Sequence, residues 1–422
     1  MVAATLILSA LNGIFPTADA TAGTLRAGGG STPFFYMPRS DVMPLAGGRA
    51  LTPPMGWNGF NHFHLVVTAE TVAAAARAMV TSGMKAAGYT YVNLDGGWDL
   101  RWRRADGAIQ PDPAKFPQGI RPVADYVHSL GLRFGIYTSA GMMNCAGTSA
   151  GSYGHYRQDA ATFASWGVDY LKLDWCYIPL RSFPHTPRRQ LSQLLARQMG
   201  DALAATGRSI LYDLNAWAED EPWSWASNMA HMWRTTPDIQ DWYESMLWNF
   251  THNVNHYAHA RPGGWNDPDM LEIGNGGMSI TEYQSQFSLW AEMAAPLIAG
   301  NDLTTMSAIT RSILINSAVI AVDQDPLGRQ GYPVASSGGH WVLTRPLADG
   351  RRAVVLFNQT NTPATISTTV AQVGLASAPE YTLLDLWAGT ATETTGVITA
   401  DVPAHGSVFY EIAETLSPPF RS

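Results

Sequence analysis

The segment Tyr170-Leu-Lys-Leu-Asp-Trp-Cys176 carries the strongest structural signal in this 422-residue chain. It has the apolar character of a short buried strand, but Lys172 lies within it and Asp174 stands at its end. These two residues are two positions apart, so their side chains leave a strand on the same face. Only three lysines occur among 26 basic residues, which indicates that a compact cation is needed here. The pair is either a structural ion pair or part of a site at a strand end.

Strand-like and helix-like patterns alternate on both sides of this segment. Strand patterns cover residues 55–58, 91–95, 134–137, 170–174, 210–214, 231–234, 264–266 and 295–297. Helical patterns lie between them, at residues 69–87, 123–130, 157–166, 189–205, 240–256 and 281–293. Eight strands that alternate with helices predict an α/β fold, the (β/α)8 or TIM barrel, here over residues 51–330.

The pattern changes after Gly328. Short strand patterns at 340–345, 353–358, 364–370, 381–385 and 407–412 are separated by turns rich in Thr, Gly and Pro. They predict a small C-terminal antiparallel β-domain, a β-sandwich over residues 331–415. Residues 21–50 are rich in Gly, Thr, Ser and Pro, and we expect them to form a linker or a disordered lead.

Composition excludes several kinds of partner. The net charge is −8 and no Lys/Arg cluster is present, which argues against nucleic-acid binding. No apolar run reaches 18 residues, so no membrane span is expected. The apolar stretch 2–15 followed by Ala18-Asp-Ala20 resembles a signal peptide over residues 1–20 that lacks a basic start. We therefore expect a secreted protein.

The chain has two cysteines, Cys145 and Cys176. In an exported protein an even pair suggests a disulfide bond. It would join the loop after one predicted strand to the loop that carries Asp174. Two free buried thiols are the alternative.

Polar residues gather at the ends of the predicted strands. Because the strand ends of a parallel barrel converge on one pocket, side chains that are distant in sequence are expected to meet there. Asp267 and Asp269 could instead be turn residues around Pro268. The full set is Asp95, Tyr137, Lys172, Asp174, Arg234, Asp238, Asp267 and Asp269.

Two carboxylates that face each other across a pocket can hydrolyse a glycosidic bond, one as nucleophile and the other as acid and then base. We expect Lys172 to keep Asp174 ionised, as a nucleophile requires. Burial is expected to raise the pKa of Asp238, as an acid requires. Arg234 could bind vicinal hydroxyls. The aromatic residues expected around the pocket are Trp57, Phe60, Trp98 and Trp175.

Neither metal chemistry nor serine hydrolase chemistry has support in the sequence. His252, His256 and His259 follow helical spacing, but no acidic or thiol partner lies nearby, so we interpret them as surface or packing residues. No nucleophile elbow occurs. No metal and no cofactor are expected.

Several motifs together resemble glycoside hydrolase family 27, the α-galactosidase or melibiase family, over about residues 50–415. The resemblance implies a retaining mechanism without metal, with Asp174 as nucleophile and Asp238 as general acid/base. It also implies a disulfide between Cys145 and Cys176 beside the nucleophile. The motifs lie at residues 53–58, 91–95, 134–137, 151–154, 169–176, 233–239, 263–271, 323–328, 385–387 and 403–406. The sugar-binding positions that it implies are Asp95, Tyr137, Lys172, Arg234 and Asp269, and Trp57, Phe60 and Trp217 complete the predicted substrate-binding set.

The chain departs from the family pattern around the sugar. Gly96 stands where the family has a second Asp that grips O4 and O6 of galactose, and Gly97 stands where a Cys is common. Phe60 replaces a Trp on the pocket floor, and Ala216 replaces a Glu near O2. Each change removes bulk or a hydrogen-bond acceptor, whereas both carboxylates of the reaction remain.

We therefore expect a retaining, exo-acting α-glycosidase that acts on an oligosaccharide or polysaccharide, by family default an α-galactosidase. Gly96 leaves isomalto-dextranase specificity open, because it could provide an exit at O6, and Ala216 leaves room for the N-acetyl group of an α-N-acetylgalactosaminide. A carbohydrate-binding protein without catalysis is a further alternative, which the retained Asp174, Asp238 and Lys172 disfavour. The sequence does not predict the oligomeric state.

Overall fold

The computed structural model describes residues 48–216 and 220–415. The expected signal peptide, the lead up to residue 47 and Trp217 lie outside this part of the chain. Within the described residues, no helix combines the length and the apolar character that crossing a membrane requires.

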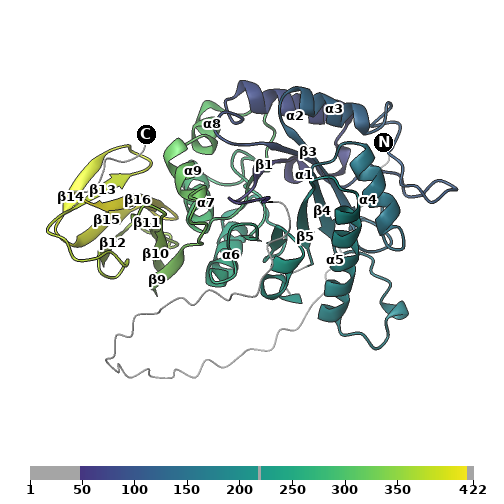
Figure 1. Cartoon of the computed structure of the whole chain (residues 1–422). Coiled ribbons are helices and arrows are strands. Elements are labelled where there is room, and N and C mark those ends of the chain that lie inside the picture. Colours follow the sequence, from purple (N-terminus) through teal and green to yellow (C-terminus); the bar gives the residue numbers. More distant parts are fainter. Residues whose placement is uncertain (1–47, 217–219, 416–422) are drawn as a thin grey trace, which may run out of the picture. The chain divides into compact units, whose positions relative to one another are not determined.

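Eight parallel strands form the first sheet, in the spatial order β7-β6-β5-β4-β3-β2-β1-β8. Figure 1 labels β1, β3, β4 and β5 of this sheet. Leu271, which follows β7, bridges to Ala299 of β8, and its N–H donates to the carbonyl of Ile298 at 2.8 Å. This contact closes the sheet, and the predicted TIM barrel is confirmed. The strands are β1 (Met55–Asn58), β2 (Tyr91–Leu94), β3 (Arg133–Ser139), β4 (Tyr170–Asp174), β5 (Leu211–Asn215), β6 (Met232–Arg234), β7 (Trp265–Asp267) and β8 (Leu297–Ala299).

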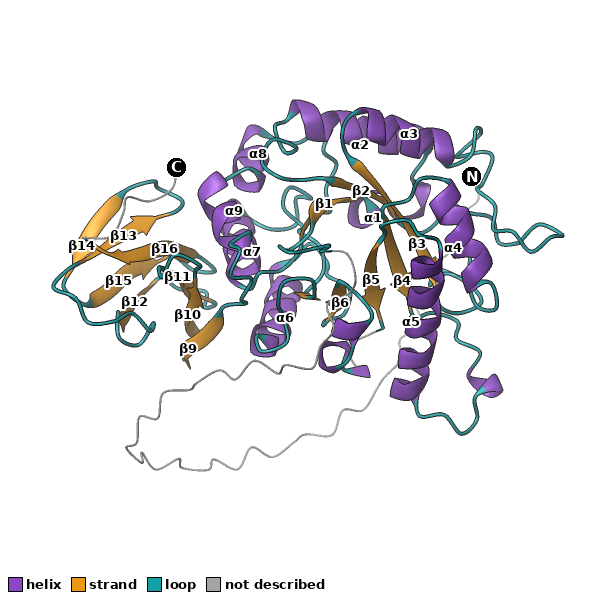
Figure 2. Ribbon diagram, in the orientation of Figure 1, coloured by secondary structure: helices purple, strands orange, loops and turns teal. Residues whose placement is uncertain are grey.

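Helices lie outside the barrel strands, as Figure 2 shows for α2 to α5. Each strand is therefore buried on two faces, by the barrel interior and by the helices, which explains the nearly continuous apolar strands. The helices are α1 (Phe60–Phe63), α2 (Ala69–Thr81), α3 (Arg121–Ser129), α4 (Tyr156–Ser165), α5 (Arg188–Ala205), α6 (Tyr243–Asn253), α7 (Ile280–Glu292), α8 (Ala308–Leu314) and α9 (Ser317–Asp323).

Some predicted boundaries were wrong, for local reasons. The helix predicted at 69–87 ends at Thr81, because Gly83 adopts a left-handed backbone with φ +88°. The strand predicted at 295–297 begins only at Leu297, after Pro296, which has no N–H to donate. The sequence patterns also missed α8 and α9, which have seven residues each and are too short to display a period.

The C-terminal region is antiparallel throughout. One sheet has the order β14-β13-β16-β11-β10-β9, and β12 pairs with β15 in a second, two-stranded sheet. Strands β9, β14 and β15 were not predicted, because exposed residues interrupt their apolar pattern. The division at residue 330 stays a prediction. The strands are β9 (Tyr332–Ser337), β10 (His340–Pro346), β11 (Arg352–Asn358), β12 (Ala364–Thr369), β13 (Tyr381–Asp385), β14 (Ala391–Thr394), β15 (Val397–Val402) and β16 (Ser407–Glu414).

Strand β11 contributes side chains to two hydrophobic clusters. Val355 and Phe357 belong to the cluster that includes the barrel and its helices. Val354 and Leu356 belong to a smaller cluster with β12 and β15. Since side chains alternate along a strand, the larger sheet packs on the barrel with one face and on the second sheet with the other.

Candidate active site

One pocket at the carboxyl ends of the barrel strands collects most of the predicted site residues. Asp95 follows β2, Tyr137 lies in β3, Lys172 and Asp174 lie in β4, and Arg234 ends β6. The barrel brings these side chains together although they span 140 positions of sequence, as expected for strand ends on one face. The residues lining the pocket are Phe60, Asn61, Leu65, Asp95, Gly96, Tyr137, Asn144, Cys145, Ala146, Lys172, Asp174, Arg234, Asp238, Asp269 and Met270.

Lys172 pairs with Asp95. Its Nζ lies 2.9 Å from Oδ2 of Asp95, which also accepts a hydrogen bond from Nδ2 of Asn58 at 2.7 Å. Burial alone would lower the pKa of Lys172, but Asp95, Asp174 and Asp269 outweigh it and raise the pKa. The lysine therefore stays charged in the pocket, and its direct partner is Asp95 rather than Asp174.

Asp174 is buried and accepts hydrogen bonds on both carboxylate oxygens. The Trp175 N–H donates to Oδ1 at 2.8 Å, and the Tyr137 hydroxyl donates to Oδ2 at 2.9 Å. Burial raises the pKa of Asp174 above its usual value, and Lys172 opposes this effect without cancelling it. Lys172 thus favours the ionised form, as expected, but does not by itself set the balance.

The predicted disulfide between Cys145 and Cys176 is confirmed, with 5.0 Å between the Cα atoms. It joins the loop after β3 to the loop after β4. Sγ of Cys145 lies 2.9 Å from Oδ2 of Asp174, and because a disulfide sulfur carries no proton this is a close contact rather than a donated hydrogen bond. Cys145 of the disulfide therefore forms part of the pocket wall beside Asp174.

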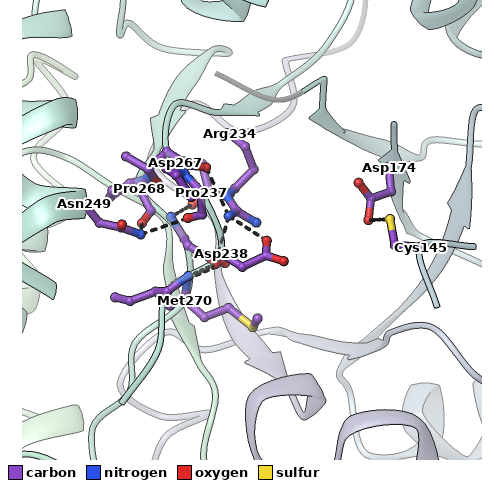
Figure 3. A network of polar contacts seen from close by, with 12 residues as sticks. Cys145, Asp174, Arg234, Pro237, Asp238, Asn249, Asp267, Pro268 and Met270 are labelled. Atoms are coloured by element: carbon purple, nitrogen blue, oxygen red, sulfur yellow. Dashed lines mark hydrogen bonds and ion pairs between the residues drawn. The ribbon is translucent and has the colours of Figure 1, made fainter. Parts of the chain in front are cut away.

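Arg234 is almost fully buried and contacts two carboxylates. Its Nη2 lies 3.0 Å from Oδ1 of Asp238 and 3.0 Å from Oδ2 of Asp269. Figure 3 shows Asp238 beside Arg234 and across from Asp174, with both carboxylates projecting into the pocket. A carboxylate at the end of β4 and one in the loop after β6 therefore face one space.

The expected raised pKa of Asp238 was wrong. Arg234 lowers the pKa of Asp238 and outweighs the opposing effect of burial. The Asp238 side chain is 73% exposed, so it is less desolvated than the apolar neighbours in the sequence indicated. The sequence did not predict this ion pair, because the contact between Arg234 and Asp238, four positions apart, depends on how the chain turns between them.

Asp269 belongs to the pocket, whereas Asp267 does not line it. Asp269 adopts a left-handed backbone with φ +80°, a strained conformation for a residue other than glycine. The N–H groups of Ile239 and Met270 each donate to its carboxylate at 2.8 Å. Oδ1 of Asp267 accepts from the Asp269 N–H at 2.9 Å, so Asp267 caps the turn that presents Asp269.

Three of the aromatic residues expected around the pocket are core residues instead. Trp57 is fully buried and donates from Nε1 to the carbonyl of Asn301 at 2.8 Å. Trp98 donates to the carbonyl of Tyr137 and packs against Phe163 of α4, and Trp175 is buried as well. They do not line the pocket because they fill the space between the strands and the surrounding elements. Phe60 does line it, and Trp217 lies outside the described residues.

The structure shows which of the positions that depart from the family pattern have room for a larger side chain. A Cβ atom on Gly96 would lie 3.4 Å from the Tyr137 ring and 3.8 Å from Nδ2 of Asn144, so the backbone there has room for a side chain. Gly97 has φ +90°, and its Cβ would meet the Leu65 carbonyl oxygen at 2.9 Å. Ala216 is buried and does not line the pocket.

Sequence patterns missed five residues of the pocket wall. Asn61 lies in the short helix α1, Leu65 lies in a 3-10 helix of three residues, and the others lie in loops, so no periodicity marks them, and none carries a charge. The short segment 60–66 after β1 supplies two of them and the loop after β3 supplies two more. The missed residues are Asn61, Leu65, Asn144, Ala146 and Met270.

The histidines and cysteines offer little to a metal ion within the described residues. His252 stacks on Trp248 and His256 stacks on Trp223, as expected for packing residues. The ligand atoms of Cys145, Cys176 and Asp174 lie within 4.8 Å of one another, but the two sulfurs are bonded together and cannot act as thiolates.

A TIM barrel whose strand ends hold opposed carboxylates, a buried lysine and a buried arginine is typical of a glycoside hydrolase. Similarity to known protein families supports the same class. Residues 52–325 match the family model "Alpha galactosidase A", and residues 337–412 match "Alpha galactosidase C-terminal beta sandwich domain". The chain belongs to glycoside hydrolase family 27, the melibiase family.

Individual relatives cover most of the chain. An α-galactosidase of Oryza sativa is 44% identical over 86% of this chain and 85% of its own length. An α-N-acetylgalactosaminidase of Gallus gallus is 37% identical over 82% of this chain and 88% of its own. The crystal structure of α-galactosidase I from Mortierella vinacea superposes with a TM-score of 0.84 at 35% identity, over 88% of this chain and 99% of that one.

Proposed function

We propose that the chain is a retaining, exo-acting α-galactosidase that removes terminal α-galactosyl residues from oligosaccharides or polysaccharides. The observation that carries the proposal is the placement of Asp174 and Asp238 in one pocket with Lys172 and Arg234 beside them. The similarity to α-galactosidases at 44% identity supports galactose as the sugar.

Asp174 is the nucleophile in this proposal. A carboxylate oxygen attacks the anomeric carbon, the bond to the leaving oxygen breaks, and a glycosyl ester of Asp174 forms. The Tyr137 hydroxyl and the Trp175 N–H hold the carboxylate in place. Lys172 supplies positive charge that favours the ionised form, against the effect of burial.

Asp238 is the general acid and then the base. It donates its proton to the leaving oxygen, and later removes a proton from the water that attacks the glycosyl ester. In the free protein Arg234 holds the pKa of Asp238 low, which disfavours the acid form. Sugar hydroxyls that accept hydrogen bonds from Arg234 would loosen this ion pair, and the pKa of Asp238 would rise when substrate binds.

The remaining charged groups suit the binding of sugar hydroxyls. Asp95 can accept hydrogen bonds, Lys172 can donate them, and Asp269 is fixed by two backbone N–H groups. Tyr137 and Phe60 contribute ring surface to the same pocket. These groups bind substrate and do not exchange covalent bonds with it.

Two observations favour neighbouring specificities as second candidates. The 37% identity to an α-N-acetylgalactosaminidase favours a 2-acetamido sugar. The room beside Gly96 favours a sugar that carries a substituent at O6, as in an isomalto-oligosaccharide. Neither observation changes the reaction, because both carboxylates are retained.

Hydrolysis of 4-nitrophenyl α-galactoside, α-N-acetylgalactosaminide and β-L-arabinopyranoside, and of isomalto-oligosaccharides, tests the proposal. We expect the galactoside to give the highest kcat/KM, with an α-configured first product in an NMR time course. Release of sugar from an isomalto-substrate without turnover of the galactoside would reject galactose. A protein that binds these sugars and hydrolyses none of them would reject the enzyme.

We also propose that the chain is exported. The disulfide between Cys145 and Cys176 supports an oxidising compartment, and residues 1–20 have the apolar character of a signal peptide. Expression of the full chain with analysis of the culture medium tests this. Recovery of the mature protein with a cleaved N-terminus supports export, and retention of the uncleaved chain in the cell contradicts it.

A further inference from the structure

Two loops that line the sugar pocket touch each other backbone to backbone. The first, after β1, contains the 3-10 helix η1 (His64–Val66), and the second follows β2 at Asp95. Gly97 of the second loop adopts φ +90°, and a Cβ there would lie 2.9 Å from the Leu65 carbonyl oxygen. Position 97 must therefore be glycine for the loops to pack this closely.

The ammonium group of Lys115 joins these loops. Its Nζ donates to the carbonyl of Leu65 at 2.6 Å and to the carbonyl of Gly97 at 2.7 Å. Within the described part of the chain, no carboxylate lies within ion-pair distance of this group. The charge therefore serves two carbonyl oxygens, one from each loop.

Lys115 is itself held in place between β2 and α3. Its N–H donates to the Asp112 carbonyl at 3.1 Å, and its carbonyl accepts from the Ala69 N–H, at the start of α2, at 3.1 Å. The next residue, Phe116, is buried in the barrel core. The lysine side chain thus reaches the two loops from a rigid base.

The two loops supply one wall of the pocket. Phe60, Asn61 and Leu65 come from the first loop, and Asp95 and Gly96 come from the second. In the first loop, His64 has φ +49°, a strained backbone for this residue type. A strained segment needs contacts that hold it, and the bond from Lys115 to Leu65 lies one residue away.

We propose that Lys115 is a positioning residue, which fixes the Phe60–Leu65 side of the sugar pocket against Asp95 through its two carbonyl contacts. It does not touch the reacting atoms. Asp174 lies in β4 and Asp238 in the loop after β6, so loss of Lys115 changes substrate binding more than it changes the chemical step. The kinetic part of this inference rests on the proposed glycosidase activity.

The matched control is Lys85, whose Nζ also donates to a carbonyl, that of Leu130 at 2.6 Å, after the end of α3. We expect Lys115→Met to lower kcat/KM for the galactoside by about 10- to 100-fold, mainly through KM, whereas Lys85→Met keeps wild-type constants. Lys115→Arg is expected to restore part of the loss, since a guanidinium group also offers paired donors.

Hydrogen exchange measured by mass spectrometry separates this inference from the proposed function. In Lys115→Met the amides of residues 60–66 and 95–97 should exchange faster than in wild type, and in Lys85→Met they should not. Unchanged exchange in a folded Lys115→Met variant, or a wild-type KM, overturns the positioning role. If wild type itself does not hydrolyse the galactoside, the proposed function fails while the exchange experiment still decides the role of Lys115.

Discussion

The pocket and the junction between the barrel and the antiparallel sheet both bury an arginine beside carboxylates. In the pocket, Arg234 lies 3.0 Å from Asp238 and 3.0 Å from Asp269. At the junction, Arg345 of β10 donates to the backbone carbonyls of Ala291 and Asp323, at 2.6 and 3.1 Å. The pocket arginine meets carboxylates directly, whereas the junction arginine satisfies backbone oxygens.

This difference sets the charge of the nearby acids. Arg234 lowers the pKa of Asp238. Burial raises the pKa of Glu292, at the end of α7, to about 8, although Arg345 opposes it, and neither oxygen of its carboxylate has a hydrogen-bond partner. Burial likewise raises the pKa of Asp323. Arg234 therefore favours the ionised form of the carboxylate that it contacts, whereas burial favours the protonated forms of Glu292 and Asp323 at the junction.

Removal of the nucleophile should have the largest effect on the pocket. Asp174→Asn keeps the size of the side chain but cannot form the glycosyl ester, so we expect kcat to fall by about 10³-fold or more. Circular dichroism and the melting temperature should stay close to wild type. Residual activity within tenfold of wild type would assign the nucleophile to another residue.

Loss of the acid should depend on the leaving group. Asp238→Asn cannot protonate the leaving oxygen, so hydrolysis of an oligosaccharide should fall by about 10²–10⁴-fold. Formation of the glycosyl ester from 4-nitrophenyl galactoside, which has a good leaving group, should fall much less. Pre-steady-state release of nitrophenol measures this step, and equal losses for both substrates would contradict the assignment.

The ion pair with Arg234 predicts a difference between two pH profiles. Activity needs protonated Asp238 and is lost as pH rises through its pKa. In the free enzyme Arg234 keeps that pKa low, and substrate that engages Arg234 should raise it. The basic limb of kcat should therefore lie at higher pH than the basic limb of kcat/KM. Coincident limbs would show that substrate leaves the Arg234–Asp238 pair intact.

The junction arginine should affect stability and leave catalysis alone. Arg345→Met removes two hydrogen bonds to buried carbonyls, and we expect the free energy of unfolding to fall by about 3 kcal/mol. Denaturant titration measures this loss, and kcat/KM of the folded fraction should match wild type. A loss of kcat/KM without a loss of stability would contradict a purely structural role for the junction arginine.

The last prediction concerns the pH dependence of stability and the junction acids. The pKa of Glu292 is about 8 in the folded chain, against 4.5 as its ordinary value. Between these values the folded state binds one more proton than the unfolded state, so stability falls as pH rises, by about 1.4 kcal/mol per pH unit. Glu292→Gln should flatten this slope between pH 5 and 8, and Glu292→Gln with Asp323→Asn should flatten it further. An unchanged slope would mean that Glu292 is ionised.

The sequence predicted the barrel and most of the pocket because both depend on position along strands. Asp174 and Arg234 end apolar strands, and any parallel barrel places strand ends together. Trp57 failed as a pocket residue because a strand pattern does not say which face lies toward the helices. The prediction of a raised pKa for Asp238 was wrong because this pKa depends on a contact with Arg234 that forms only when the chain between them folds into a turn.

Contacts between residues far apart in the sequence could not be predicted either. Lys172 is 77 positions from Asp95, and Lys115 is 50 positions from Leu65, so no spacing rule connects either pair. The scarcity of lysine did mark Lys172 as unusual. The same observation applied to Lys115, but without a strand end beside it the sequence offered no site to assign it to.

The scarcity of lysine has a practical consequence for coupling chemistry. The amines of all three lysines donate hydrogen bonds, but Lys115 and Lys172 are partly buried, whereas Lys85 is exposed. Lys85 follows α2 and lies near the amino ends of the barrel strands, at the end of the barrel opposite the pocket. Among the lysines, an amine-reactive surface or label should therefore couple at this position. Molecules immobilised through Lys85 would share one orientation, with the pocket open to a passing substrate.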